Sequence, residues 1–167
     1  MTNIVERARV FATAAHAAVG QTRKYTGEPY VVHPIEVSEL VASVNGTEAM
    51  VAAALLHDVL EDTEVTVDLL EEQFGSKVAD LVLWLTDISR PKDGNRSARK
   101  ALDRQHSAAA PAAAQTIKVA DLISNTRSII AHDPGFAKVY LEEKRLLLDV
   151  LTRADPTLLT IAREQVG

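Results

Sequence analysis

Residues 52–63 read AAALLHDVLEDT, and this stretch decides the fold expected for the chain. On a helix, where successive residues turn by about 100°, the apolar residues in the second half of the stretch fall on one side: Leu55, Leu56, Val59 and Leu60. The opposite side carries two pairs with i,i+4 spacing, His57 with Glu61 and Asp58 with Asp62. The pattern predicts one continuous helix with an apolar side for the core and an opposite side of ionisable groups.

The ionisable side of this helix requires a partner or solvent. Most of its groups are carboxylic acids near a helix C-terminus, where the dipole disfavours negative charge and like charges raise one another's pKa. A bound divalent cation reverses this argument. An arginine or lysine from elsewhere, or exposure to water, would also satisfy the acids, so the spacing by itself leaves three explanations open.

Two further residues favour the cation. His33, in YVVHP, and Asp121, in TIKVADLISN, each lie in an otherwise apolar setting, where a buried Asp without a partner is costly. A single His in such a place is also common as a hydrogen-bonded core residue. Together with His57 and Asp58, these residues would form a mixed N/O site of the kind that suits Mn, Fe, Zn or Mg. The chain contains no Cys, so thiolate ligands are excluded.

The composition predicts an all-α protein, a single domain over residues 1–167, arranged as an irregular helical bundle. Hydrophobic residues make up 47% of the chain and charged residues 25%, as in an ordinary globular domain, while aromatic residues make up only 4%. No segment alternates as a strand does. Helices are expected at residues 4–19, 34–44, 48–60, 67–74, 76–85, 97–109, 111–131, 135–153 and 156–165.

The same features restrict the classes of function. No uninterrupted apolar run approaches the roughly 18 residues that a membrane span needs. The N-terminal residues lack the apolar block of a signal peptide, so a cytoplasmic protein is expected. A net charge of −5 argues against general nucleic-acid binding. These features disfavour a membrane and nucleic acid as partners, and the oligomeric state cannot be read from the sequence.

Charge is unevenly distributed along the chain. Residues 48–72 contain eight acidic residues and no Lys or Arg, whereas residues 85–130 contain eight basic residues against four acidic ones. The acidic segment could hold a cation and the basic segment an anion. Solvated helix faces explain most of these charges as well.

Three segments resemble the RelA/SpoT-type hydrolase domain of the HD phosphohydrolase superfamily: AAHAAVGQTRKYTGEPYVVHPIEV (14–37), ALLHDVLEDT (54–63) and IKVADLISNTRSI (117–129). The order H…HD…D marks that superfamily. At 167 residues the chain is similar in extent to the stand-alone small alarmone hydrolases, such as the metazoan SpoT homologue. The resemblance implies an HD-type helical fold and a phosphohydrolase that removes the 3′-pyrophosphate of guanosine tetra- or pentaphosphate, the alarmone (p)ppGpp.

The resemblance also implies a set of site residues. The metal is usually manganese, with zinc, iron and magnesium left open, and its implied ligands are His33, His57, Asp58 and Asp121. The implied catalytic acidic pair is Glu61 and Asp62. The residues implied in substrate binding are Arg23, Lys24, Asn125 and Ser128, with looser matches at Tyr140, Arg96 and Lys144. The basic residues within 90–104 either meet the pyrophosphate or form the solvated face of a helix.

Departures from the family pattern leave the substrate open. Residues 122–125 read Leu-Ile-Ser-Asn, where many long family members have a basic residue followed by Leu-His-Asn. One alternative is the same chemistry on another nucleotide, either an adenosine alarmone or the 2′-phosphate of NADPH. Another is a metal-free alarmone-binding module, against which the complete set of implied ligands speaks.

Overall fold

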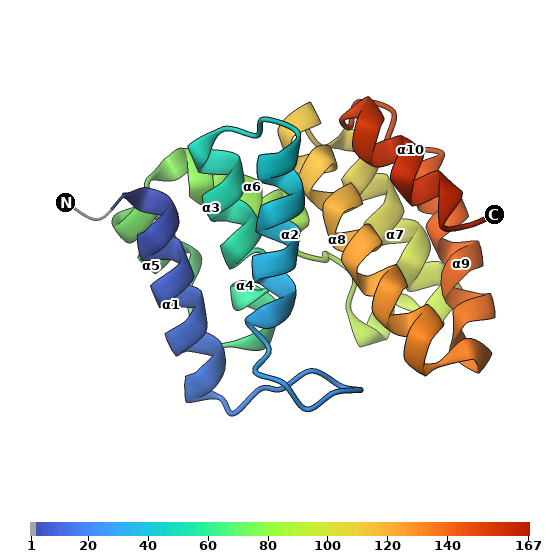
Figure 1. The fold of residues 1–167 in the computed structure, drawn as a ribbon, viewed down its shortest axis with the longest axis horizontal. Coiled ribbons are helices and arrows are strands. Elements are labelled where there is room, and N and C mark those ends of the chain that lie inside the picture. Colours follow the sequence, from blue (N-terminus) through green and yellow to red (C-terminus); the bar gives the residue numbers. More distant parts are fainter. Residues whose placement is uncertain (1–2) are drawn as a thin grey trace. The chain divides into compact units, whose positions relative to one another are not determined.

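The structure, a computed structural model, describes residues 3–167, and its regular elements are helices (Figure 1). Within these residues the extended backbone pairs only in an isolated bridge between Thr22 and Pro29. The predicted all-α class is therefore confirmed. The chain forms two compact units, Met1–Thr86 and Asp87–Gly167. None of the helices in residues 3–167 combines the length and the apolar character needed to cross a membrane.

The first unit is built around a buried central helix, α3. Its helices are α1 (Ile4–Ala18), α2 (Val32–Ser43), α3 (Glu48–Leu56), α4 (Val59–Asp62), α5 (Val67–Phe74) and α6 (Ser76–Leu85). Residues 52–56 of α3 are each at most 2% exposed, and α1, α2 and α6 pack against this helix. Burying Leu55 and Leu56 contributes on the order of 2 kcal/mol each. The site residues that follow α3 are thus attached to the core of this unit.

Local capping fixes where several of these helices begin. The side chain of Thr47 accepts a hydrogen bond from the backbone N–H of Met50, and that of Thr66 accepts one from Leu69. Both helix starts agree with those predicted from the sequence. Asn45, with a φ of 61°, lies in the turn between α2 and α3.

The prediction of one helix over residues 48–60 is wrong at its C-terminal end, because the helix breaks between α3 and α4. Asp58 has φ −102° and ψ −1°, outside the usual α-helical values. The backbone N–H of His57 lies 3.5 Å from the carbonyl of Ala54, only three residues back. The His57 ring bonds the same carbonyl at 2.7 Å, so a side chain competes with the helical hydrogen bonds at this point. The ionisable residues of the stretch therefore do not share one continuous helix.

The second unit is centred on the longest helix, α8. It contains η1 (Pro91–Asp93), α7 (Arg96–Ala109), α8 (Ala112–His132), α9 (Pro134–Leu148) and α10 (Pro156–Glu164). Both α9 and α10 pack on α8, whose Ile117 and Ile123 are fully buried. The residues before α9 and α10, Asp133 and Asp155, accept hydrogen bonds from the first helical turns.

The helix predicted for residues 135–153 ends at Leu148. The backbone N–H of Arg153 donates to Oε1 of Gln115 at 2.9 Å. The side chain of Gln115 is 1% exposed, and its Nε2 lies 3.2 Å from the carbonyl of Ala110. This buried amide ties the segment after α9 to α8, which requires the chain to leave the helical path.

Candidate active site

Three of the four metal ligands implied by the resemblance come together in the first unit. His33 lies in the first turn of α2, while His57 and Asp58 occupy the break after α3. The distances to Oδ2 of Asp58 are 3.1 Å from Nε2 of His57 and 3.9 Å from Nε2 of His33. One ligand atom from each residue lies within 4.8 Å of the others, and both histidine residues are at most 2% exposed. This group could hold a metal ion.

The orientation of the His57 ring suits metal binding. Its Nδ1 lies 2.7 Å from the carbonyl oxygen of Ala54. A carbonyl only accepts hydrogen bonds, so Nδ1 carries the hydrogen and Nε2, on the side of Asp58, keeps its lone pair. Metal-binding histidines commonly have such a second partner, which fixes the tautomer. Two imidazoles and a carboxylate fit a divalent ion that accepts mixed N/O ligands.

Tyr30 holds the carboxylate of this group. Its hydroxyl donates to Oδ2 of Asp58 at 2.6 Å, and its ring centroid lies 6.0 Å from that of His33. The hydrogen bond restricts the rotation of the carboxylate and keeps one of its oxygens beside the imidazoles. Tyr30 therefore orients Asp58 in this group, as the Ala54 carbonyl orients His57.

We expect Tyr30→Phe to weaken divalent metal binding by about 10- to 100-fold, the usual effect of removing a partner of a metal ligand. Isothermal titration with manganese measures this change. Tyr25→Phe, in the same loop, is the matched control and should retain the wild-type affinity. Unchanged affinity in Tyr30→Phe would contradict the supporting role of its hydroxyl.

The implied catalytic acids, Glu61 and Asp62, lie on α4 and are exposed. Oδ2 of Asp62 accepts a hydrogen bond from Nε2 of Gln21 at 3.2 Å. Although the residue is exposed, burial of its carboxylate and the nearby charge of Asp58 raise the pKa of Asp62, while the hydrogen bond from Gln21 opposes this shift. A carboxylate with a raised pKa is a better proton acceptor than an ordinary Asp.

Arg23 and Lys24 lie in the loop between α1 and α2, where the sequence predicts a loop. The Arg23 guanidinium stands 6.0 Å over the ring of Tyr30, and the Lys24 ammonium 5.3 Å over the ring of Tyr25. The planar Arg23 group therefore lies near the ring that also supports Asp58. Such a group can stack on a nucleobase.

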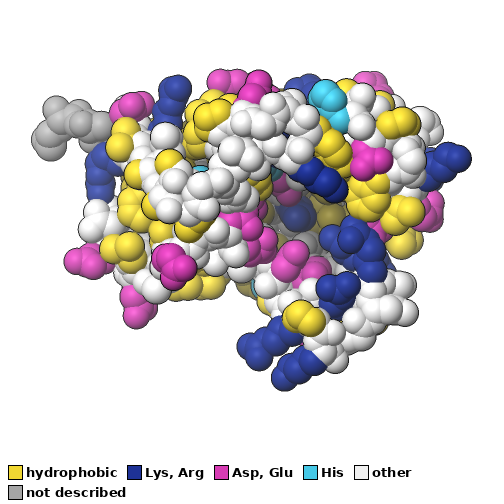
Figure 2. Space-filling view, turned by 90° about the horizontal axis from the view of Figure 1, so that it is seen from below, with side chains coloured by type: hydrophobic (Ala, Val, Ile, Leu, Met, Phe, Trp, Pro, Cys, Tyr) yellow, Lys and Arg dark blue, Asp and Glu magenta, His cyan; other side chains and the backbone are white. Residues whose placement is uncertain are grey.

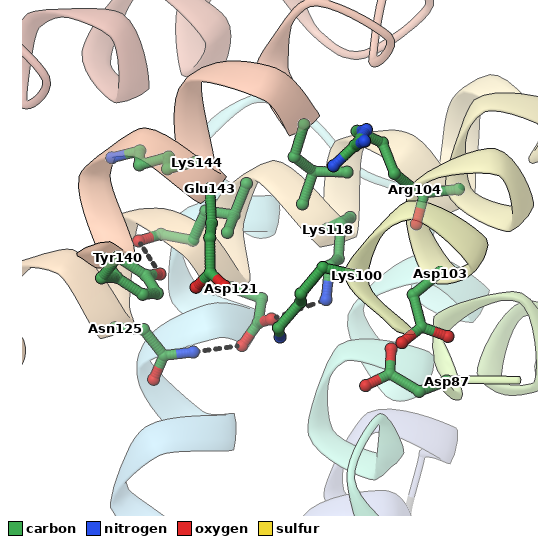
Figure 3. Close-up of a pocket in the computed structure, with 13 residues that line it drawn as sticks. Asp87, Lys100, Asp103, Arg104, Lys118, Asp121, Asn125, Tyr140, Glu143 and Lys144 are labelled. Atoms are coloured by element: carbon green, nitrogen blue, oxygen red, sulfur yellow. Dashed lines mark hydrogen bonds and ion pairs between the residues drawn. The ribbon is translucent and has the colours of Figure 1, made fainter. Parts of the chain in front are cut away.

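A pocket in the second unit collects several of the other candidates (Figure 3). Asp121 and Asn125 reach it from α8, one turn apart, and Tyr140 and Lys144 line it from α9. Basic residues from α7 and α8 also line it: Lys100, Arg104 and Lys118. Four acids line it as well: Asp87, Asp103, Asp121 and Glu143. The lining is therefore mixed in charge, and its basic side chains are the groups that can bind the phosphates of a nucleotide.

Asp121, the fourth implied metal ligand, is held by two neighbours on α8. Its Oδ1 accepts a hydrogen bond from Nδ2 of Asn125 at 3.1 Å, and its Oδ2 lies 3.4 Å from Nζ of Lys118. The residue is 7% exposed. Asp121 belongs to the second unit and the other three candidates to the first, so its role as a ligand stays a prediction.

Lys144 is buried more deeply than a phosphate-binding lysine usually is. The residue is 1% exposed, and its Nζ donates to Oγ1 of Thr126 at 2.8 Å and to Oε1 of Gln165 at 2.6 Å. Figure 3 shows its ammonium group directed away from Asp121. Burial lowers the pKa of Lys144 to about 8. These bonds join α8 and α9 to the residue that follows α10.

Stability should increase with pH above about 8 because of Lys144. Its pKa is about 8 in the folded protein and 10.5 as the ordinary value, so the unfolded chain binds more protons between these values. The unfolding free energy should therefore rise by roughly 2 kcal/mol between about pH 8 and 9.5. Above that range Tyr140 acts in the opposite direction, because burial raises its pKa in the folded state.

Urea unfolding at several pH values measures this contribution. Lys144→Met should flatten the rise, whereas Lys138→Met, which changes an exposed lysine of the same helix, should preserve it. The same slope in wild type and Lys144→Met would contradict the assignment.

Two substrate candidates of the second unit, Arg96 and Ser128, lie outside the set of residues that line this pocket. Arg96, in the first turn of α7, forms a two-pronged ion pair with Glu143 at 2.8 and 2.9 Å and stands 5.4 Å over the ring of Phe136. Ser128 lies on α8 one turn beyond Asn125 and is half-buried. Glu143 does line the pocket, so Arg96 neutralises an acid of its wall.

The basic segment 90–104 contains both exposed and pocket-lining residues. Arg90, Lys92 and Arg96 are exposed, whereas Lys100 and Arg104 are half-buried and line the pocket. Figure 2 shows Lys and Arg side chains gathered on one part of the molecular face that it displays. The sequence left open whether these residues meet the pyrophosphate or form a solvated helix face. The exposed residues fit the solvated face, and the pocket-lining ones remain candidates for phosphate binding.

Several residues around these sites were not predicted as site residues from the sequence. Tyr30, His16 and Gln21 lie within the segment that resembles the family, but only their contacts distinguish them from ordinary loop and helix residues. Asp87 lines the pocket, and burial raises its pKa, while the charge of Lys118 lowers it. No pattern in the sequence marks Asp87 as a pocket residue.

The fold and this arrangement of His and Asp residues define an HD domain. The HD-domain family matches residues 8–142, and the chain belongs to this family. The resemblance of its three sequence segments to this superfamily is therefore confirmed.

Two relatives extend this family assignment. The chain is similar to a probable guanosine-3′,5′-bis(diphosphate) 3′-pyrophosphohydrolase of Synechocystis sp., with 35% identity over 134 residues, 78% of this chain and 17% of the relative. It is also similar to a guanosine-3′,5′-bis(diphosphate) 3′-pyrophosphohydrolase of Aquifex aeolicus, with 33% identity over 141 residues, 84% of this chain and 19% of the relative. The chain thus spans less than a fifth of the length of these relatives.

A solved structure matches almost the whole chain. It is described as a metazoan ortholog of SpoT that hydrolyzes ppGpp and plays a role in starvation responses. The TM-score is 0.86 at 28% identity, and the match covers 99% of this chain and 94% of that one. A protein of Listeria monocytogenes, with a TM-score of 0.67 and 27% identity, matches 84% of this chain.

Proposed function

We propose that this protein hydrolyses the 3′-pyrophosphate of guanosine tetra- or pentaphosphate, giving GDP or GTP and pyrophosphate. The observation that carries the proposal is the group of buried His33 and His57 with half-buried Asp58 in a chain of this family. Similarity along nearly its whole length to a protein described as hydrolyzing ppGpp supports the choice of substrate.

We further propose that a divalent ion, manganese by the resemblance, is held by His33, His57, Asp58 and Asp121. When bound, such an ion polarises a phosphoester and lowers the pKa of a coordinated water. The fixed tautomer of His57 and the hydrogen bond from Tyr30 to Asp58 support the ligand set. The mixed nitrogen and oxygen ligands suit several divalent metals, so they do not by themselves select manganese.

In this proposal the acids of α4 handle protons and the basic residues hold the substrate. Asp62, whose pKa is raised, accepts a proton from the attacking water, and Glu61 lies beside it on the same short helix. Arg23 packs against the base with Lys24 nearby, and Asn125 binds the ribose. The cations of the pocket in the second unit neutralise phosphate groups.

We also propose that residues 1–167 act as one functional domain that works in the cytoplasm on a small nucleotide. The family match over residues 8–142 includes parts of both compact units, which supports a shared function. The net charge of −5 is unfavourable for binding nucleic acid.

A second candidate keeps the chemistry and changes the substrate to an adenosine alarmone or NADPH. It is favoured by the Leu-Ile-Ser-Asn run at residues 122–125, which contains the proposed ribose contact. A metal-free binding module is the least supported candidate, because the ligand and acid residues are all present.

The test is a manganese-supplemented assay with guanosine tetraphosphate, its adenosine analogue and NADPH as separate substrates. Release of pyrophosphate from the guanosine compound, faster than from the adenosine one, is the expected result. Faster reaction of the adenosine compound, or phosphate release from NADPH, would support the second candidate. Protein shown to contain manganese that acts on none of the three would refute both.

A further inference from the structure

His16 is a buried histidine that the proposed reaction does not yet use. It lies near the end of α1, is 1% exposed, and its Nδ1 lies 2.8 Å from Oε1 of Gln21. Its Nε2 is buried without a hydrogen-bond partner among the described protein atoms. A histidine held by one nitrogen only, with the other unsatisfied, is unusual in a well-packed interior.

The partners of Gln21 fix the direction of each hydrogen bond. Nε2 of Gln21 lies 3.2 Å from Oδ2 of Asp62. Because an ionised carboxylate only accepts, Gln21 must direct its NH₂ group to Asp62 and its oxygen to His16. Nδ1 of His16 therefore carries the hydrogen and donates it. A proton on Nε2 would leave a buried donor unpaired, so one neutral tautomer is selected.

The backbone holds Gln21 firmly between these two side chains. Its N–H donates to the carbonyl of His16 at 3.1 Å, and its carbonyl accepts from the N–H of Tyr30 at 3.2 Å. The His16 ring also packs on the Tyr30 ring, with centroids 4.8 Å apart. Gln21 is thus held by hydrogen bonds at its backbone and at the oxygen of its side-chain amide.

The carboxylate that the Gln21 amide contacts needs such support. Asp62 is exposed on a helix of four residues, and the charge of Asp58 lies close enough to disfavour a second negative charge there. Without a donor, the Asp62 side chain is free to rotate toward water, away from Asp58. The hydrogen bond from Gln21 opposes both the rotation and the repulsion.

We propose that His16 and Gln21 are positioning residues that hold the Asp62 carboxylate in one orientation, with His16 orienting the Gln21 amide and the amide orienting Asp62. The inference rests on the proposed function, in which Asp62 accepts a proton. It adds two residues that touch neither metal nor substrate. Preorganisation of this kind acts on kcat because it fixes a group in the geometry that the reaction needs.

The first experiment compares Gln21→Met with the wild type in a steady-state assay. Removing the amide should lower kcat on the order of 10-fold or more, the effect typical of outer-shell partners, with KM and manganese affinity unchanged. In an Asp62→Asn background the same substitution should have no further effect, because the Gln21 amide then has no carboxylate to hold. An equal loss of kcat in both backgrounds would overturn the proposal.

The second experiment separates positioning by His16 from its packing in the core. His16→Leu removes the donor, whereas His16→Asn places an amide N–H near the position of Nδ1. We expect His16→Leu to lower kcat as Gln21→Met does, and His16→Asn to restore most of that loss, with thermal unfolding recorded for both. Equal kcat values in two folded variants would show that the ring acts through packing alone and would overturn the role of His16.

A spectroscopic measurement decides the geometry independently of activity. Long-range ¹H–¹⁵N NMR spectra of the wild type should show the His16 ring as the neutral Nδ1–H tautomer. The Nε2–H tautomer would overturn the inference even in an active enzyme. If the wild type turned over no nucleotide, the proposed function would fail, while the tautomer would still test the hydrogen bonds that link His16, Gln21 and Asp62.

Discussion

Replacing Asp58 by alanine should lower kcat/KM for alarmone hydrolysis by on the order of 10³-fold or more and should remove most of the bound divalent metal. Metal assistance to phosphoester cleavage is worth several kcal/mol, and each 1.36 kcal/mol corresponds to about tenfold in rate. Asp58 supplies a carboxylate oxygen close to both imidazoles, 3.1 Å from Nε2 of His57 and 3.9 Å from Nε2 of His33. In the proposed ligand set, its loss should therefore leave two imidazole nitrogens and the single carboxylate of Asp121, which hold a divalent ion less tightly.

Metal analysis of the purified protein and steady-state kinetics with added manganese measure the two effects together. Asp58→Asn preserves the size of the side chain and an oxygen that can accept from Tyr30, and it should lose activity as Asp58→Ala does. Asp80→Ala, which changes an exposed acid on α6, is the matched control and should behave as the wild type. Full metal content in folded Asp58→Ala would refute the assignment of Asp58 as a ligand.

Replacing Asp62 by asparagine should lower kcat by about 10²- to 10⁴-fold, the range expected for loss of a general acid or base. Unlike the change at Asp58, it should leave metal content intact, because Asp62 lies on α4 and is not one of the three candidate ligands that lie together. The amide keeps the size of the carboxylate but cannot accept the proton. Since Asp62 is exposed, the substitution should alter the stability of the fold little.

Single-turnover kinetics with saturating substrate separates the chemical step from binding. Glu61→Gln tests the second acid in the same way, and a smaller effect there would place Asp62 as the main proton acceptor. Glu64→Gln changes a neighbouring exposed acid and should retain wild-type kinetics. Loss of metal together with activity in Asp62→Asn would assign this residue to the metal site instead of proton transfer.

Local patterns in the sequence were sufficient to predict most helices of this fold. The caps at Thr47 and Thr66 and the apolar spacing of Leu55 and Leu56 act within one or two turns. Interactions this short in range are encoded in neighbouring residues, so a reading of the chain recovers them. The all-α class and the start of α3 follow from these local interactions.

The break after Leu56 and the early end of α9 were not predictable in this way. At the break the His57 ring donates to the carbonyl of Ala54, a side-chain contact that the apolar spacing of the stretch does not reveal. The end of α9 involves the buried amide of Gln115, 38 residues before Arg153. Helical propensity alone favours continuing both helices, and it is overridden by a local side-chain bond at His57 and by a tertiary hydrogen bond after α9.

The order of residues along the chain was enough to establish the helical class, the family and the chemical types available for a site: imidazoles and carboxylates without thiols. The contact of His33 with His57 and Asp58, the burial of Lys144 and the link from His16 to Asp62 through Gln21 emerge only in the folded protein. The difference lies in the range of the interactions. Helix formation depends on neighbours a few residues apart, whereas ligand distances, burial and tautomers depend on side chains that only folding brings into contact.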